Sequence, residues 1–246
     1  MRRRTTDPRP VSTPRDWDAA TYDRVAAPQT RWGTAVLDRL PLAGDETVLD
    51  AGCGSGRVTE QLLDRLPDGR VIALDASPAM VAEARRRNPG VDVVETDMRA
   101  LALGRRFDAI TCLFSSVAYG DDLDAAVAAL ASHLTPGGVL VLDGWIRPGD
   151  WLDPSPTQVL SARSPDGTLA ACRLGHSTRD GRHTHLDLQY LIGRTGQPTV
   201  HVVEHHELTL FTDDEYRAAF TRAGLTVEIV PGPFVERDRY AGVAPS

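Results

Sequence analysis

Residues 48–56 are Val48-Leu49-Asp50-Ala51-Gly52-Cys53-Gly54-Ser55-Gly56, an apolar run that ends in an acid followed by three alternating glycines. A helical pattern starts directly after them, at Arg57. Glycines at alternate positions leave the backbone bare, so a ligand can approach the end of the strand closely. The amides of the loop and the N-terminus of the helix then face a polar or negative ligand group. The stretch therefore predicts a strand–loop–helix unit that cradles a cofactor.

The spacing of the glycines argues against a dinucleotide as that cofactor. A dinucleotide loop has the spacing G-x-G-x-x-G, whereas Gly52, Gly54 and Gly56 follow G-x-G-x-G. The acid before them, Asp50, stands where a carboxylate can meet a ligand ammonium. A second strand ends at Asp75, which lies 75 − 56 = 19 residues past the last glycine. That distance is near the spacing expected of an acid that binds ribose hydroxyls.

Strands and helices alternate over residues 46–143, which predicts a parallel sheet with right-handed crossovers. After the strand at 70–74, further strands are expected at 91–94, 108–113 and 138–142. The strand at 91–94 leads into Asp97 and Met98, and the strand at 108–113 leads into Phe114 and Ser115. Because the strands are parallel, these residues gather at one sheet edge, where open α/β sheets bind ligands.

From about residue 17 onward, this pattern resembles the class I S-adenosylmethionine (SAM)-dependent methyltransferases. The resemblance implies an α/β Rossmann-like fold with a mostly parallel seven-stranded sheet, and SAM as the cofactor. Its implied cofactor contacts are Asp50, Gly52, Gly54 and Gly56 at the methionine part, Asp75 and Ala76 at the ribose, Asp97 and Met98 at the adenine, and Phe114 and Ser115 beside the sulfonium. SAM has no phosphate, so the loop would serve an amino acid and a ribose.

The alternation breaks at Gly144, where a region rich in Pro, Gly and Asp begins. Three extended runs follow, and Asp180-Gly181 between the first two is a strong hairpin signal. These runs, at 168–178, 183–193 and 199–211, predict an antiparallel β lobe inserted before the last helix. That helix is expected over 213–223, with Thr212 as its N-cap and Gly224 at its C-terminal stop. Strands at 225–230 and 239–243 would close the sheet.

Four parts are therefore expected along the chain. They are a disordered tail rich in Arg, Pro and Thr (1–16), the SAM-binding core (17–143), the inserted lobe on the substrate side (144–212), and the last helix with the closing strands (213–246). The core is expected to start with a helical region over 17–45, with Val36 and Leu37 on its apolar face.

Several segments resemble a narrower group, the N,N-dimethyltransferases of nucleotide-linked 3-aminosugars in antibiotic biosynthesis. They include Asp97-Met98-Arg99, Phe114-Ser115-Ser116-Val117, His176-Ser177 and the stretch 208–225. The resemblance implies N-methylation of an amine by in-line transfer. It implies Tyr22, Tyr119 and His176 as candidate catalytic residues, with Trp145 and Arg237 on the substrate side. It also suggests a TDP-aminosugar as the acceptor and allows a homodimer.

Composition narrows the partners and the chemistry. The net charge is −7 and no basic stripe is visible, so nucleic acid is not an expected partner. All 27 Lys and Arg residues are Arg, which excludes Schiff-base and P-loop chemistry because both need a lysine. No apolar run is long enough to span a membrane, and three cysteines without metal or disulfide spacing favour a cytoplasmic protein.

Three other functions remain open at the level of the sequence. The N-terminal half also looks like methyltransferases of small carboxylic acids, which allows O-methylation of a small metabolite. Departures from the aminosugar group around Asp143 and Arg237 allow a non-catalytic SAM-binding module. A nicotinamide-dependent oxidoreductase shares the fold class. No metal site is expected, because His201 and His205 share a strand face while His206 points away, and no clear carboxylate completes a set.

Overall fold

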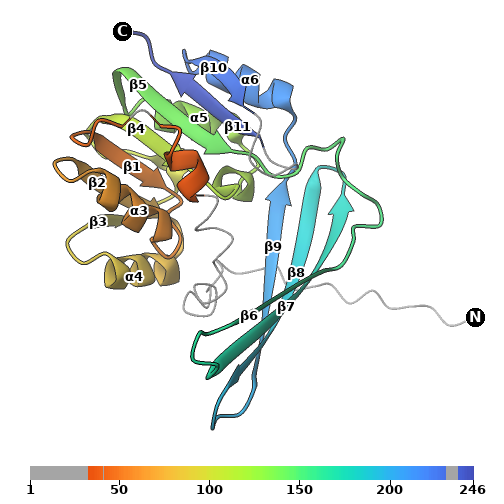
Figure 1. The fold of residues 1–246 in the computed structure, drawn as a ribbon. Helices are drawn as coiled ribbons and strands as arrows, with labels where there is room; N and C mark the ends of the chain where they lie inside the picture. Colours follow the sequence, from red (N-terminus) through yellow and green to blue (C-terminus); the bar gives the residue numbers. More distant parts are fainter. Residues whose placement is uncertain (1–32, 41, 231–237) are drawn as a thin grey trace, which may run out of the picture.

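A seven-stranded sheet, here sheet A, forms the centre of the computed structural model, which describes residues 33–40, 42–230 and 238–246 (Figure 1). Its strand order is β10-β11-β5-β4-β1-β2-β3. All strands run in one direction except β11, which is antiparallel to both of its neighbours. The strands are β1 (Thr47–Ala51), β2 (Arg70–Asp75), β3 (Asp92–Glu95), β4 (Phe107–Cys112), β5 (Leu134–Asp143), β10 (Thr226–Val230) and β11 (Arg239–Val243). The expected mostly parallel seven-stranded sheet is confirmed.

Helices cover both faces of sheet A. The helices α3 (Arg57–Arg65) and α4 (Pro78–Arg87) lie on one face, and α5 (Leu123–Ala131) and α6 (Asp213–Arg222) on the other. Because both faces are covered, the central strands are near-continuous apolar runs. Successive residues point to opposite layers: Leu49, Ile72, Ile110 and Leu140 pack toward α5 and α6, whereas Val48, Val71, Ala109 and Val141 pack toward α3.

The ends of the last helix follow the sequence expectation closely. The Thr212 side chain accepts a hydrogen bond from the Glu215 amide, and the Glu215 side chain accepts one from the Thr212 amide. This capping box satisfies two amides that the first helical turn leaves without partners. At the other end, Gly224 has a φ of +80°, the left-handed conformation that stops a helix.

The predicted N-terminal helical region is only partly confirmed, since 17–32 and residue 41 lie outside the described residues. Residues 33–37 are helical, and Val36 and Leu37 are each 1% exposed. The chain turns at 38–40 and is extended by Thr47, so the helix ends earlier than position 45. Pro41 in the sequence explains this, because a proline disfavours helical backbone in the residue before it.

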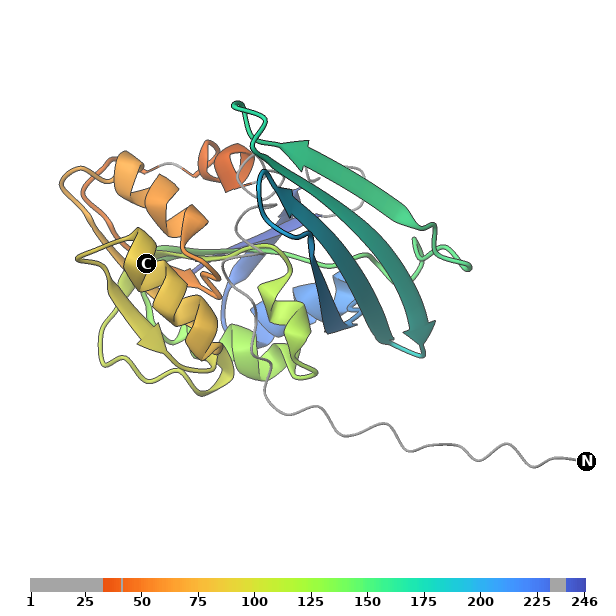
Figure 2. The same cartoon turned by 90° about the horizontal axis from the view of Figure 1, so that it is seen from below.

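The inserted lobe is a four-stranded antiparallel sheet, here sheet B, in the order β6-β7-β8-β9. Its strands are β6 (Gln158–Arg163), β7 (Leu169–Asp180), β8 (His183–Arg194) and β9 (Val200–Thr209). They stand side by side next to the helical layers (Figure 2). The hairpin at Asp180-Gly181 is confirmed, with Gly181 at φ +59°. The sequence analysis missed β6, because all six of its residues are exposed and carry no core pattern.

None of the helices in the described part of the chain is both long and apolar enough to cross a membrane.

Candidate functional site

The glycine loop between β1 and α3 is fixed to the end of β2. The amides of Gly52 and Cys53 both donate to the Leu74 carbonyl, at 2.8 and 2.9 Å. Gly52, Gly54 and Gly56 have φ values of +72°, +54° and +81°, which L side chains rarely adopt. The sequence therefore needs glycine at these three positions for conformational reasons alone.

The three glycines differ in what surrounds them. A Cβ at Gly52 would lie 2.6 Å from the Ser116 Cβ, and one at Gly56 would lie 2.4 Å from the Asn88 Nδ2. A Cβ at Gly54 would meet nothing within 4 Å. Gly52 and Gly56 are thus close-packing positions, whereas the backbone at Gly54 borders open space that a ligand can occupy.

Asp75 at the end of β2 holds the loop from the other side. Its Oδ2 accepts from the Gly54 amide and its Oδ1 from the Ser77 amide, both at 2.9 Å. Burial raises the pKa of this carboxyl, and the two amide hydrogen bonds partly oppose the shift. Each carboxylate oxygen has a second lone pair, so Asp75 can still accept hydrogen bonds from ligand hydroxyls.

Asp50 lies deeper, at 2% exposure, near the end of β1. The Thr59 hydroxyl donates to its Oδ2 at 2.6 Å and the Thr111 hydroxyl to its Oδ1 at 3.4 Å. Burial raises the pKa of Asp50 to about 6, and the two threonine hydroxyls act in the opposite direction. A carboxyl in this state gains most from a nearby cation, which would favour its ionised form.

The turn after β4 is strained and held in place by Asp143. Phe114 and Ser115 have φ values of +60° and +59°, an unusual pair for residues other than glycine. The Asp143 Oδ1 accepts from the Ser115 amide at 2.6 Å, and the Ser115 hydroxyl donates to the Gly144 carbonyl at 2.9 Å. Asp143 is fully buried. The sequence analysis named Phe114 and Ser115 but not the carboxylate that shapes their turn.

Asp97 and Met98 stand at the same edge of sheet A, next to β2 and β4. Asp97 caps the short helix η1 (Met98–Ala100) and forms an ion pair with Arg99 at 2.5 Å. The Arg99 side chain lowers the pKa of Asp97. The Met98 sulfur lies 3.8 Å from the Cys112 sulfur. Asp97 is thus already engaged by its own neighbour, while Met98 presents a thioether toward the loop.

One face of sheet B meets the edge of sheet A. The Tyr119 hydroxyl, in the short helix η2 (Ser116–Tyr119), lies 3.0 Å from the His206 Nδ1 on β9. The Trp145 Nε1 donates to the Thr184 hydroxyl on β8 at 3.2 Å. The lobe therefore brings buried side chains of β8 and β9 against the strand ends that carry the predicted cofactor contacts.

His176 does not join Tyr119. It pairs in register with Asp187, next to His205 on β9, while Leu186 pairs with His206. Since side chains alternate between the faces of a sheet, His176 lies on the opposite face from His206. It is also exposed. Tyr22 and Arg237 lie outside the described residues.

Comparison with known proteins identifies the family. A model described as a methyltransferase domain matches residues 48–138. The chain is 38% identical over 200 residues to the dTDP-3-amino-3,6-dideoxy-alpha-D-glucopyranose N,N-dimethyltransferase of Streptomyces fradiae. This alignment covers 80% of this chain and 76% of that protein. The crystal structure of Streptomyces venezuelae DesVI matches with a TM-score of 0.84 and 32% identity, over 94% of this chain and 100% of that one. This chain belongs to the class I SAM-dependent methyltransferases.

A second solved structure of this methyltransferase family holds the cofactor. It is SAM-bound CalS10, an amino pentose methyltransferase from Micromonospora echinaspora involved in calicheamicin biosynthesis. The match has a TM-score of 0.72 and 36% identity over 90% of each chain. Both structural matches extend past the core and cover the region of sheet B.

The residues of this methyltransferase fit SAM. The open space at Gly54 leaves room at the loop, and the buried carboxylate of Asp50 and the half-buried one of Asp75 suit a cofactor that carries an ammonium and a sulfonium. Asp50 would face the methionine part, Asp75 the ribose hydroxyls, and Met98 the adenine. These roles remain predictions. The N-terminus of α3 would add backbone amides for the carboxylate of the cofactor.

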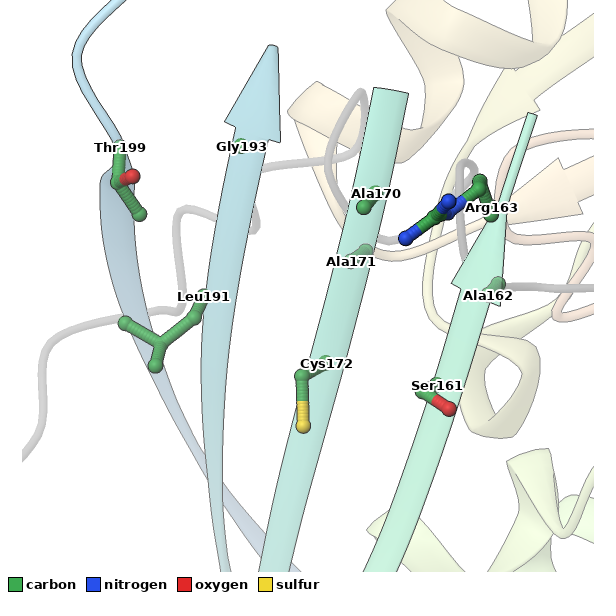
Figure 3. Close-up of a pocket in the computed structure, with 9 residues that line it drawn as sticks. All are labelled: Ser161, Ala162, Arg163, Ala170, Ala171, Cys172, Leu191, Gly193 and Thr199. Carbon is green, nitrogen blue, oxygen red and sulfur yellow. The ribbon is translucent and has the colours of Figure 1, made fainter. Parts of the chain in front are cut away.

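Two other features of the methyltransferase lie away from this edge. A shallow hollow of about 540 Å³ lies on the outer face of sheet B, lined by residues such as Arg163, Cys172 and Leu191 (Figure 3). The residues that line it include no paired acid and base, and none of them belongs to the glycine loop.

No group of three or more His, Cys, Asp or Glu side chains within the described ranges could hold a metal ion. The acid beside His206 is Glu204, which the sequence analysis missed.

Proposed function

We propose that this methyltransferase transfers a methyl group from SAM to the amine of a nucleotide-linked aminosugar, in the making of a natural product. The observation that carries the proposal is the extent of the likeness. The named dTDP-aminosugar N,N-dimethyltransferase matches 80% of this chain, and DesVI matches 94%, so the likeness includes the inserted lobe, which we propose contacts the acceptor. Methyltransferases that shared only the cofactor loop would match the core alone.

The chemistry asks little of the protein beyond position. When bound, SAM supplies a methyl group on a sulfonium, an already activated carbon. The protein then has to hold the acceptor amine in line, at about 3 Å, and exclude water. Tyr119 and Trp145 stand where the core meets the lobe, and both are proposed to contact the acceptor there. Arg237 is proposed to bind the acceptor's phosphates, because a guanidinium matches phosphate geometry.

The direct test compares an amine with a hydroxyl in the same framework. Purified protein is incubated with SAM and either a dTDP-3-amino-6-deoxy sugar or the matching dTDP-6-deoxy sugar with a hydroxyl at that carbon. We expect one or two methyl masses on the amine and none on the hydroxyl sugar. Methylation of the hydroxyl sugar, or of a small carboxylic acid instead, would establish O-methylation. Tight SAM binding with no product from any acceptor would establish a binding module.

The outer face of sheet B supports a proposal for assembly. Four exposed apolar side chains share that face, and the first two are partners in register: Val159, Leu174, Leu191 and Val203. Exposed apolar side chains gathered on one face are typical of protein interfaces. We infer a homodimer formed through this face. Light scattering should give a dimer for the wild type and a monomer for Leu191→Arg; a wild-type monomer at high concentration refutes it.

We also propose that the reaction takes place in the cytoplasm. All three cysteines, Cys53, Cys112 and Cys172, are free thiols, and two are buried. Free thiols are typical of a reducing compartment. Cell fractionation with an antibody to the native protein tests this assignment.

A further inference from the structure

Three polar side chains form a continuous path from the exterior into the junction of the core and the lobe. Tyr119 is 41% exposed, whereas His206 and Glu204 behind it are 5% and 8% exposed. The Tyr119 hydroxyl lies 3.0 Å from the His206 Nδ1, and the two rings meet edge to face. The His206 Nε2 lies 3.4 Å from the Glu204 Oε2. The path therefore leads from the Tyr119 hydroxyl through the His206 imidazole to the Glu204 carboxylate.

The backbone of β9 explains this alignment. Residues two apart on a strand point to the same face, so Glu204 and His206 both face the core. Burial of a carboxylate is costly unless it is paired. Within the described residues, the polar neighbours of the Glu204 carboxylate are the His206 Nε2, at 3.4 Å, and the Tyr190 hydroxyl. A buried acid beside a histidine is a common feature of functional sites.

Glu204 determines which nitrogen of His206 carries the proton. An ionised carboxylate beside Nε2 favours a hydrogen on that nitrogen. Nδ1 then keeps its lone pair and accepts the hydrogen of the Tyr119 hydroxyl. This leaves the Tyr119 oxygen able to accept a hydrogen bond from an amine N–H on its exposed side. The order of groups follows the same logic as a serine–histidine–aspartate triad.

We propose that Tyr119, His206 and Glu204 form a proton relay that deprotonates the acceptor nitrogen. The relay rests on the proposed function, since it needs an amine acceptor. The N–H bond of the acceptor breaks and its electron pair stays on nitrogen. That proton passes to the Tyr119 oxygen while the Tyr119 proton passes to the His206 Nδ1. The imidazolium is stabilised by Glu204 and later releases its proton to solvent. Tyr119 is the catalytic residue, and His206 and Glu204 are positioning residues that act through it.

Other charged groups near the relay come from the adjacent strands. Tyr190 on β8 and Arg173 on β7 are paired in register and lie beside Glu204 on the same face. Burial, and next the Glu204 carboxylate, raise the pKa of Tyr190, whereas Arg173 opposes the shift. His206 itself is contacted by Tyr119 from η2 and Glu204 from β9. Tyr190 stays neutral at working pH, so it takes no part in the proton transfer.

The first test is the pH profile of methyl transfer in His206→Gln, Glu204→Gln and Tyr119→Phe. General base catalysis is worth about 10²-fold, so we expect a loss of that size in kcat at neutral pH. The loss should shrink toward about pH 9, where more of the acceptor amine is already neutral. SAM affinity, measured by calorimetry, should stay unchanged. The matched control is His205→Gln, since His205 is the next residue on β9, lies on the opposite face and is exposed.

The second test does not depend on turnover. Nitrogen NMR of histidine-labelled protein should show the His206 ring protonated at Nε2 and bare at Nδ1, and Glu204→Gln should abolish that preference. Equal losses at every pH, a profile no different from the control, or an unchanged tautomer in Glu204→Gln would each overturn the relay. Failure of the wild type to methylate any amine overturns the proposed function instead, and with it the acceptor's part in the relay.

Discussion

The carboxylate of Asp143 accepts a 2.6 Å hydrogen bond from the backbone amide of Ser115, across 28 residues of sequence. The bond joins the end of β5 to the turn after β4, and it stabilises two consecutive residues in left-handed backbone. Such backbone costs about 1–3 kcal/mol per residue and persists only where the surroundings hold it. Asp143 therefore sets the shape of the turn at this edge of sheet A.

Replacing Asp143 by alanine tests that role. The change leaves the Ser115 amide without its acceptor in a buried site, which costs about 1–3 kcal/mol of unfolding free energy. We also expect weaker SAM binding because the turn relaxes. Urea denaturation and calorimetry measure the two effects. As a control, Asp124→Ala removes an exposed carboxylate on α5 that pairs with Arg222, and it should keep SAM affinity; equal behaviour of the two variants would refute the assignment.

Asp75 is expected to bind the ribose hydroxyls of SAM. Asp75→Ala removes the acceptor for the Gly54 and Ser77 amides as well as for the ligand, so SAM affinity should fall by about 10–100-fold. Asp92→Ala is the matched control, because Asp92 is an exposed acid on the neighbouring strand, paired with Arg105. Titration calorimetry distinguishes them, and an unchanged affinity in Asp75→Ala would contradict this contact.

Two glycine substitutions separate packing from ligand space. Both Gly52→Ala and Gly54→Ala place a side chain in left-handed backbone, at a cost of about 1–2 kcal/mol. Only Gly52→Ala also collides with Ser116, which adds about 1–3 kcal/mol. Gly54→Ala should instead lower SAM affinity, about tenfold, because its methyl group enters the open space of the loop. Thermal melts and SAM titrations of the pair provide the comparison; full affinity in Gly54→Ala would show that the cofactor lies elsewhere.

Asp50 predicts a pH dependence of cofactor binding. Its pKa in the folded protein is raised to about 6, so it is mostly protonated at about pH 5 and mostly ionised at about pH 7. If it meets the ammonium of SAM, the affinity should rise about tenfold over that interval. Asp50→Asn should remove the dependence, whereas Asp64→Asn on the exposed side of α3 should keep it. A flat profile in the wild type would exclude Asp50 as the ammonium partner.

The raised pKa of Asp50 also makes the stability of the fold depend on pH, and here a higher pH is unfavourable. A carboxyl with a raised pKa binds its proton more tightly in the folded state than in the unfolded chain. Asp50 therefore costs stability as the pH rises from about 4 to about 6. Asp50→Asn should lose that slope in urea denaturation across this interval, and a slope equal to the wild type would place the titrating group elsewhere.

The cofactor half of this protein could be predicted from sequence because its signals are local. The loop from Gly52 to Gly56, the acid at Asp75 and the capping residues around α6 each act over a few residues or one strand–helix unit. Left-handed φ values at all three glycines explain why the pattern is so distinctive. The hairpin at Gly181 is local in the same way.

The parts that sequence reasoning missed depend on contacts between distant segments. β6 has no buried residue, so its only signal is pairing with β7. Asp143 shapes a turn 28 residues away, and the Tyr119–His206 contact spans 87 residues. The spacing of Glu204 and His206 is visible in the sequence, but the face they share and the hydroxyl they meet are set by how sheet B packs against sheet A.

The central claim is that this chain methylates an amine. The most direct measurement uses SAM labelled with carbon-13 in its methyl group and a dTDP-3-aminosugar, followed by proton–carbon NMR of the product. We predict a labelled methyl resonance with correlations to the sugar carbon that bears nitrogen, and none in the absence of protein. A folded, SAM-binding protein that leaves the aminosugar unlabelled, or that places the label on oxygen, would contradict the claim.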